Sequence, residues 1–187
     1  MASPSRPPSR RRHSARVKQN TFSLKIMKRV QGNPDVALLE CTNPVRNKWR
    51  IRWDVTADDS GAASYMEEEF NHKPSGEEIK SLISGWINAR TDEHILSGFR
   101  YNGKTVWLST ENQFNYKAAY DLAVQTAGAS LPVTFKLGED DSPEYVTFEE
   151  LTALSSFYTG AMKFIQDTLA QGWKAKDSID LALYSAD

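Results

Sequence analysis

Histidine and cysteine, which serve most often in metal binding and nucleophilic catalysis, are few and widely spaced in this chain. The histidines are His13, His72 and His94, and Cys41 is the only cysteine. Zinc sites need pairs of such ligands at short, regular spacing, such as two histidines four residues apart on a helix. No such pair occurs, so the sequence predicts no transition-metal site. We expect His94, near a helix C-terminus, to complement the helix dipole.

An acidic cluster lies in a predicted loop, at Glu139, Asp140, Asp141 and Glu144. A calcium loop places its ligands at alternating positions and ends with a distal bidentate glutamate. The cluster lacks this pattern. We therefore expect a solvated hairpin loop that binds no cation.

Signatures of the common enzyme classes give no support for a reaction. The chain has no G-x-S-x-G nucleophile elbow and no G-x-G-x-x-G dinucleotide fingerprint. Two carboxylates facing each other in a cleft could hydrolyse a glycosidic bond, and the sequence singles out no such pair. We predict a protein that is not an enzyme and uses no cofactor, with an enzyme that acts on glycans as one alternative.

Charge is divided unequally between the start of the chain and the rest. The first 29 of 187 residues hold nine basic side chains and no acidic one, which leaves 14 basic and 24 acidic side chains for the body. A body with a net charge of −10 repels nucleic acid. The sequence therefore predicts an acidic body that is a poor nucleic-acid binder, preceded by a basic arm.

The basic arm over residues 1–29 is rich in Pro, Ser and Arg at its start, so we expect it to be disordered. Its Arg10, Arg11 and Arg12 could form a nucleic-acid or nuclear-import cluster, which gives the alternative of a nucleic-acid-associated regulator. A transit peptide is Arg- and Ser-rich too, but the prolines disfavour the helix that it needs. We favour a third interpretation, in which the true start is Met27 and the leader has no role.

Alternation of side chains predicts a β-hairpin early in the body. Lys48 to Val55 places aromatic and aliphatic residues on one face and charged residues on the other, as in a half-buried strand. A turn at residues 58–61 leads to a partner strand over residues 63–70. Its glutamates at 67–69 are expected opposite Arg50 and Arg52. Since the tryptophans lie on the other face, a nucleic-acid platform on this strand is disfavoured.

Three S/T-x-x-E/Q boxes, each typical of a helix start, set the rest of the plan. They are Ser75–Glu78, Thr110–Gln113 and Thr147–Glu150. We expect the first helix to bury a stripe at Ile79, Leu82, Ile83, Trp86 and Ile87 and to stop at Gly98. The second is expected to pack through Phe114, Ala118, Ala119, Leu122 and Ala123. The third follows a strand pair over residues 131–146, ends at Gly172, and leads to a short helix near 176–184.

The predicted fold is therefore α+β, a single small domain in which successive short hairpins are each followed by an amphipathic helix, ββα-ββα-ββαα. The second hairpin turns at Asn102-Gly103, the strongest short-range hairpin signal. We divide the chain into the arm over 1–29, an N-terminal hairpin region over 30–75 and an α+β domain over 76–187. The chain has more aromatic residues than one core easily buries, and exposed aromatic residues often belong to interfaces. We therefore predict interface or core anchors at Trp49, Trp53, Trp107, Trp173 and Tyr101.

From Phe99 onward a series of residues resembles a known family. The series is Tyr101-x-Gly103-x-x-Val106, Gln113, Pro132-Val133, residues 145–151 (YVTFEEL), Trp173, and Lys176-Asp177-x-Ile179-Asp180. In this order they are similar to a domain-of-unknown-function family, number 4376, of tailed-phage and prophage proteins, over about residues 79–182. The family often sits at the end of tail-fibre or tail-fibre-assembly proteins.

The resemblance implies a phage or prophage origin and a structural or interaction role, as a tail-fibre component or as a factor that assists fibre assembly. It implies protein partners from the phage tail or fibre, with a homo-oligomer as one form. The implied location is the host bacterial cytoplasm during assembly, or the virion. None of the matching motifs is catalytic. Since phage receptor-binding proteins can act on glycans, the resemblance gives a glycan-acting receptor-binding component as one alternative. No apolar run is long enough to span a bilayer, so we expect no membrane association.

Overall fold

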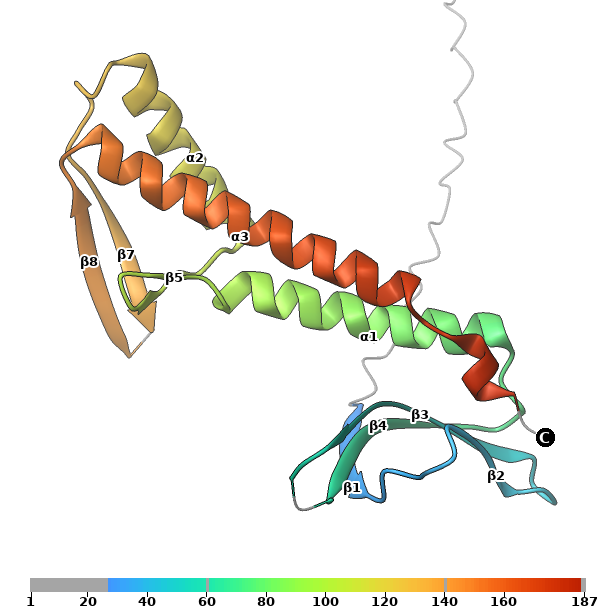
Figure 1. Cartoon of the computed structure of the whole chain (residues 1–187). Helices are drawn as coiled ribbons and strands as arrows, with labels where there is room; N and C mark the ends of the chain where they lie inside the picture. The colour runs from blue at the N-terminus through green and yellow to red at the C-terminus, as the bar shows by residue number, and fades with distance from the viewer. Residues whose placement is uncertain (1–26, 60, 140, 186–187) are drawn as a thin grey trace, which may run out of the picture.

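The computed structural model describes residues 27–185 with the exception of residues 60 and 140. The fold is α+β, as predicted, and in the described chain it contains three α-helices and three antiparallel sheets. The expected ββα rhythm fits loosely, because the first unit has four strands instead of two. Figure 1 shows a pair of long helices with strands packed at each end.

The N-terminal sheet contains the predicted hairpin and two further strands, in the order β1-β4-β3-β2. The basic arm predicted over 1–29 lies outside the described residues up to residue 26, and its last two basic residues, Lys28 and Arg29, belong to β1. The strands are β1 (Lys28–Gly32), β2 (Leu39–Asn43), β3 (Lys48–Ala57) and β4 (Ala63–Phe70).

Opposite charges face each other across β3 and β4 in the predicted register. Arg50 is paired with Glu69 and Arg52 with Glu67. Arg50 Nη2 lies 2.5 Å from Glu69 Oε1, and Arg52 Nε lies 3.5 Å from Glu67 Oε2. Arg52 is only 5% exposed and also donates to Glu40 Oε2 at 2.7 Å. This confirms the expected cross-strand pairs and shows that one of them is buried.

Helix α1 (Gly76–Ser97) begins and ends as the sequence predicts. Ser75 Oγ accepts from the Glu78 N–H, and the Glu78 carboxylate accepts from the Ser75 N–H, which completes the capping box. The predicted stripe packs inward: three of its isoleucines are buried, and Leu82 and Trp86 are partly buried beside them. At the C-terminus the Gly98 N–H donates to the His94 carbonyl.

Helix α2 (Thr110–Gln125) follows the short hairpin of β5 (Arg100–Tyr101) and β6 (Lys104–Thr105). Asn102 and Gly103 form its turn with positive φ, as predicted. The predicted capping box is wrong by one residue: Ser109 is the N-cap, and Gln113 Nε2 donates to the Leu108 carbonyl. Either hydroxyl of the Ser109-Thr110 pair could cap, and the sequence pattern alone does not separate them.

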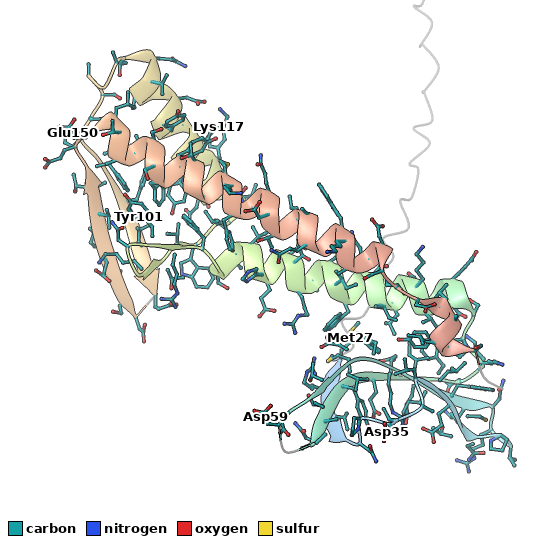
Figure 2. All side chains as sticks on the ribbon, viewed as in Figure 1. Met27, Asp35, Asp59, Tyr101, Lys117 and Glu150 are labelled. Atoms are coloured by element: carbon teal, nitrogen blue, oxygen red, sulfur yellow. The ribbon has the colours of Figure 1, made fainter. Side chains whose placement is uncertain are left out.

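Helix α3 (Leu151–Asp177) follows the predicted strand pair, β7 (Val133–Glu139) and β8 (Ser142–Phe148). The third predicted capping box is wrong, because Thr147 stays in β8, where its hydroxyl bonds to that of Thr134. Glu150 is the N-cap and makes no side-chain capping bond. Figure 2 places Glu150 at the junction of β8 and α3.

Gly172 does not end α3, contrary to prediction. The helix continues to Asp177, and Gly172 is buried against α1, where an added Cβ would lie 2.6 Å from Thr91 Oγ1. A glycine inside a helix costs stability but allows close packing with a neighbouring helix. The last predicted helix is a single 3₁₀ turn, η1 (Leu181–Tyr184).

Two hydrophobic cores lie at opposite ends of the α1–α3 pair (Figure 1). We name them the sheet core and the hairpin core. The buried residues of the sheet core are Leu39, Ile51, Trp53, Met66, Ile79, Ile83, Ile87 and Tyr184. Those of the hairpin core are Val106, Leu108, Tyr116, Ala123, Phe135, Leu137, Phe148, Leu154, Phe157 and Ala161.

The close packing at Gly172 predicts opposite effects for two glycine-to-alanine changes. Gly172→Ala forces a Cβ against Thr91, and we expect a net loss of about 1 kcal/mol of unfolding free energy, since overpacking outweighs the gain in helix propensity. Gly85→Ala, on α1 with open space around it, should stabilise by about 0.5–1 kcal/mol. Urea unfolding measures both, and a stabilised Gly172→Ala would contradict the tight crossing.

The buried pairing of Arg52 predicts a large cost for its removal. Arg52→Leu leaves Glu67 and Glu40 without this partner, and we expect a loss of about 3 kcal/mol in unfolding free energy. The matched exposed pair is Lys117–Asp121 on α2, where Lys117→Leu should change stability by less than about 0.5 kcal/mol. Equal effects of the two changes in urea unfolding would show that burial of Arg52 is unimportant.

Tyr184 predicts a specific loss of stability at high pH. Burial raises the pKa of Tyr184 to about 12, and its hydroxyl donates to the Arg52 carbonyl at 3.0 Å. Since the folded state disfavours the phenolate, this group has no pH effect on stability below about pH 10, the pKa of an unfolded tyrosine. Between pH 10 and 12 the wild type should lose unfolding free energy that Tyr184→Phe keeps. Parallel curves for the two proteins would contradict this.

Candidate functional site

The five aromatic residues predicted as interface or core anchors fall into different environments. Trp53 is 3% exposed and belongs to the sheet core, with its ring edge-to-face on Trp86. Tyr101 packs in the hairpin core against Phe148 and Phe157, with ring centroids 5.8 and 5.1 Å away. Figure 2 shows Tyr101 beside the β7–β8 hairpin. These two residues anchor the cores.

The other three predicted anchors are more accessible. Trp49 and Trp107 are partly buried, and Lys73 Nζ lies 5.2 Å above the Trp49 ring. Trp173, on the outer side of α3, is 57% exposed. Of the five, Trp173 therefore offers the most open aromatic surface. Arg10, Arg11 and Arg12, the predicted basic cluster, lie outside the described residues.

An exposed apolar stripe on α2 is the clearest surface feature that sequence reasoning assigned wrongly. Phe114 and Leu122 were expected in the core, and they are 70% and 52% exposed; Ala118 between them is exposed as well. Residues four apart on a helix share a face, so these three form one strip, which we call the α2 outer face. The core side of α2 consists of Tyr116, Ala119, Tyr120 and Ala123.

A cleft of about 610 Å³ lies between α1 and α3, and we call it the α1–α3 cleft. Most of its lining comes from the C-terminal half of α1 and the facing turns of α3. A smaller hollow of about 300 Å³ beside the sheet core shares Trp86, Ile87 and Ala175 with it. The cleft lining is Trp86, Ile87, Arg90, Thr91, Glu93, His94, Ser97, Thr168, Gln171, Gly172 and Ala175.

Three ionisable side chains, Arg90, Glu93 and His94, line this cleft, all from α1. The guanidinium of Arg90 lies 5.2 Å above the Trp86 ring. The His94 ring packs on Phe164 with centroids 5.2 Å apart. His94 lies in the last turn of α1, as predicted, and also faces the cleft. The arrangement offers an aromatic wall and a cation, which suit binding of a small anionic group.

Glu78 and Tyr116 have pKa values that are shifted by their surroundings in the fold. Hydrogen bonds from the Ser75 backbone and from His72 lower the pKa of Glu78, which serves the start of α1. Burial raises the pKa of Tyr116 in the hairpin core. Both shifts accompany structural contacts of these residues, a helix cap and a packed core.

The described residues contain no group of three or more His, Cys, Asp or Glu side chains placed to hold a metal ion. Within the same part of the chain, no helix is both long and apolar enough to cross a membrane.

The segment from Gly98 to Thr105 matches the letters of a P-loop, G-x-x-x-x-G-K-T. A P-loop joins a strand to the N-terminus of a helix, whose N–H groups hold phosphate. Here the segment leaves the C-terminus of α1 and ends in β6. Lys104 forms an ion pair with Glu144, and the Thr105 hydroxyl donates to Glu139 Oε1 at 2.8 Å. The segment is therefore a hairpin and not a phosphate loop.

Comparison with known proteins gives one match. The model of a family described as Domain of unknown function (DUF4376) matches residues 78–187. No curated protein and no solved structure matches the chain. The matched region begins in the first turn of α1 and contains α2, both hairpins after α1, α3 and η1. Because this region covers more than half of the chain, the protein belongs to the DUF4376 family.

Proposed function

We propose that this chain is a non-enzymatic interaction protein of a phage or prophage, associated with tail fibres or with their assembly. The observation that carries the proposal is the α2 outer face, an apolar strip on a helix that already has a filled core side. Contiguous apolar patches on the surface of a protein often mark the sites where other proteins bind. The occupant that we propose is an apolar segment of a tail or fibre protein.

The position of the exposed aromatic residues supports a partner at the hairpin-core end of the molecule. Phe114 at 70% exposure presents most of its ring to solvent, and Tyr145 on β8 is more exposed still. Aromatic side chains supply much of the binding energy at protein interfaces. Both residues lie in the part of the chain that matches the family.

The phage assignment is supported by the residues that carry the family resemblance, and the structure gives several of them a structural task. Gly103 adopts the positive φ of the hairpin turn. Lys176 Nζ donates to Asn88 Oδ1 at 2.9 Å and so links the end of α3 to α1. Asp180 caps η1 through the Ala182 N–H, and Ile179 packs on the sheet core. These residues maintain the fold, while the outer surfaces are left for partners.

Two measurements on the producing phage or prophage test the proposal. Proteomics of purified particles should detect the protein if it is a virion component. If it is an assembly factor, it should be absent from purified particles, and deletion of its gene should reduce the number of fibres on each particle. Absence from particles together with normal fibres after deletion would disprove the proposal.

Substitution of the α2 outer face tests where the partner binds. Phe114→Glu with Leu122→Glu places charges on the strip, and we expect at least a tenfold loss of tail or fibre proteins recovered with the tagged protein, with an unchanged melting temperature because both side chains are exposed. Val45→Glu is the matched control, since Val45 is 94% exposed and lies in the turn between β2 and β3 of the N-terminal sheet. Equal recovery of tail or fibre proteins with the wild type, the Phe114/Leu122 double variant and the Val45 variant would exclude the α2 outer face as the binding site.

A further inference from the structure

We infer that the α1–α3 cleft binds a carboxylate of a partner protein, presented by an acidic side chain with an apolar residue next to it. The inference goes beyond the proposed function, since it assigns a second surface and the chemistry of the segment that binds there. It uses a surface separate from the α2 outer face. Three features support the inference: Arg90 has no ion-pair partner within the described chain, the lining holds one permanent cation, and apolar side chains of the smaller hollow lie next to it.

Arg90 is a cation held in position without a carboxylate. The arginines of the sheet that face carboxylates are all paired: Arg29 with Asp54, Arg50 with Glu69, and Arg52 with Glu40. Arg90 forms no ion pair within the described chain, and its one recorded contact there is with the Trp86 ring. Stacking on an aromatic face fixes the plane of a guanidinium and leaves its N–H donors at the edge for a planar anion. Arg90 is therefore pre-arranged to bind a carboxylate.

The charge of the lining selects a monoanion. Arg90, Glu93 and His94 are its ionisable groups, and α3 contributes only the uncharged Thr168, Gln171, Gly172 and Ala175. Arg90 is the one permanent cation of this lining and Glu93 adds a negative charge, so the second charge of a phosphate dianion has no permanent cation to pair with. A single carboxylate requires only one cation, and Arg binds it through two parallel hydrogen bonds. The balance of charges favours carboxylate over phosphate.

Apolar surface next to Arg90 indicates what accompanies the carboxylate. Trp86 and Ile87 line both the cleft and the smaller hollow, where Ile83 and Leu183 extend the apolar lining. The hollow also contains two carboxylates, of which Asp54 is paired with Arg29 and Asp180 caps η1. Leu183 is largely exposed, although it belongs to the turn that closes the sheet core. A peptide segment with a glutamate in the cleft could place a neighbouring aliphatic side chain in this hollow. Because the α1–α3 cleft continues into the smaller hollow, a protein segment can occupy both, whereas a small free acid would occupy the cleft alone.

Binding of short peptides to the full chain tests the inference directly. The probe is acetyl-Leu-Glu-Leu-amide, with acetyl-Leu-Gln-Leu-amide, acetate and inorganic phosphate for comparison, each titrated while the side-chain NMR signals of Arg90 and His94 are followed. We expect saturable shifts with the glutamate peptide. Its dissociation constant should be at least tenfold lower than that of the glutamine peptide or of acetate.

Two charge-matched variants on α1 give the control. Arg90→Gln should weaken binding of the glutamate peptide at least tenfold, whereas Lys80→Gln, an exposed position outside the cleft, should leave it unchanged. Equal binding of both peptides, equal binding by the Arg90 variant, or tighter binding of phosphate would overturn the inference. Acetate binding as tightly as the peptide would overturn the assignment to a protein segment. Because the titration uses isolated protein, its failure leaves the results for particles and for the α2 outer face unaffected.

Discussion

The close approach of α1 and α3 at Thr91 and Gly172 is the contact on which the arrangement of the molecule depends. Among the strands of the described chain, the N-terminal sheet shares none with the two later hairpins, so no ladder between these strands joins the two ends. What joins them is the helix pair, because α1 contributes Ile79 to the sheet core and Ile95 to the edge of the hairpin core. A side chain at position 172 would meet Thr91 of α1, since an added Cβ would lie 2.6 Å from Thr91 Oγ1.

The charge pattern of β3 and β4 fixes how the sheet meets the helices. A one-residue slip would turn every side chain to the opposite face, which would take Arg52 from Glu67 and remove Trp53 from the core. The backbone of Arg52 also accepts the Tyr184 hydroxyl, from a segment 132 residues later in the chain. The N-terminal sheet lies outside the family match, yet it packs on the matched region through this contact and through α1.

Local sequence patterns were sufficient to predict an element where residues close together in the chain determine its structure. The alternation around Ile51, the Ser75–Glu78 box and the Asn102-Gly103 turn each predicted their elements correctly. The face of α2 was not predictable, because Phe114, Ala118 and Leu122 obey helical spacing as well as Tyr116 and Tyr120 do, and burial is decided by which set meets Phe157. The cleft was not predictable either, since it joins Arg90 and Gln171 from helices far apart in the sequence.

One contact therefore governs both the stability of the fold and the shape of its cleft. Thr91 and Gly172 set the distance between the helices, and both line the cleft beside Arg90. The helices approach so closely at Gly172 that an added Cβ would lie 2.6 Å from Thr91 Oγ1, and the cleft lies beside this contact. Packed interiors transmit small displacements because they are dense. An occupant that pressed α1 and α3 apart would therefore act directly on the contact between Thr91 and Gly172, which belongs to the lining of the cleft.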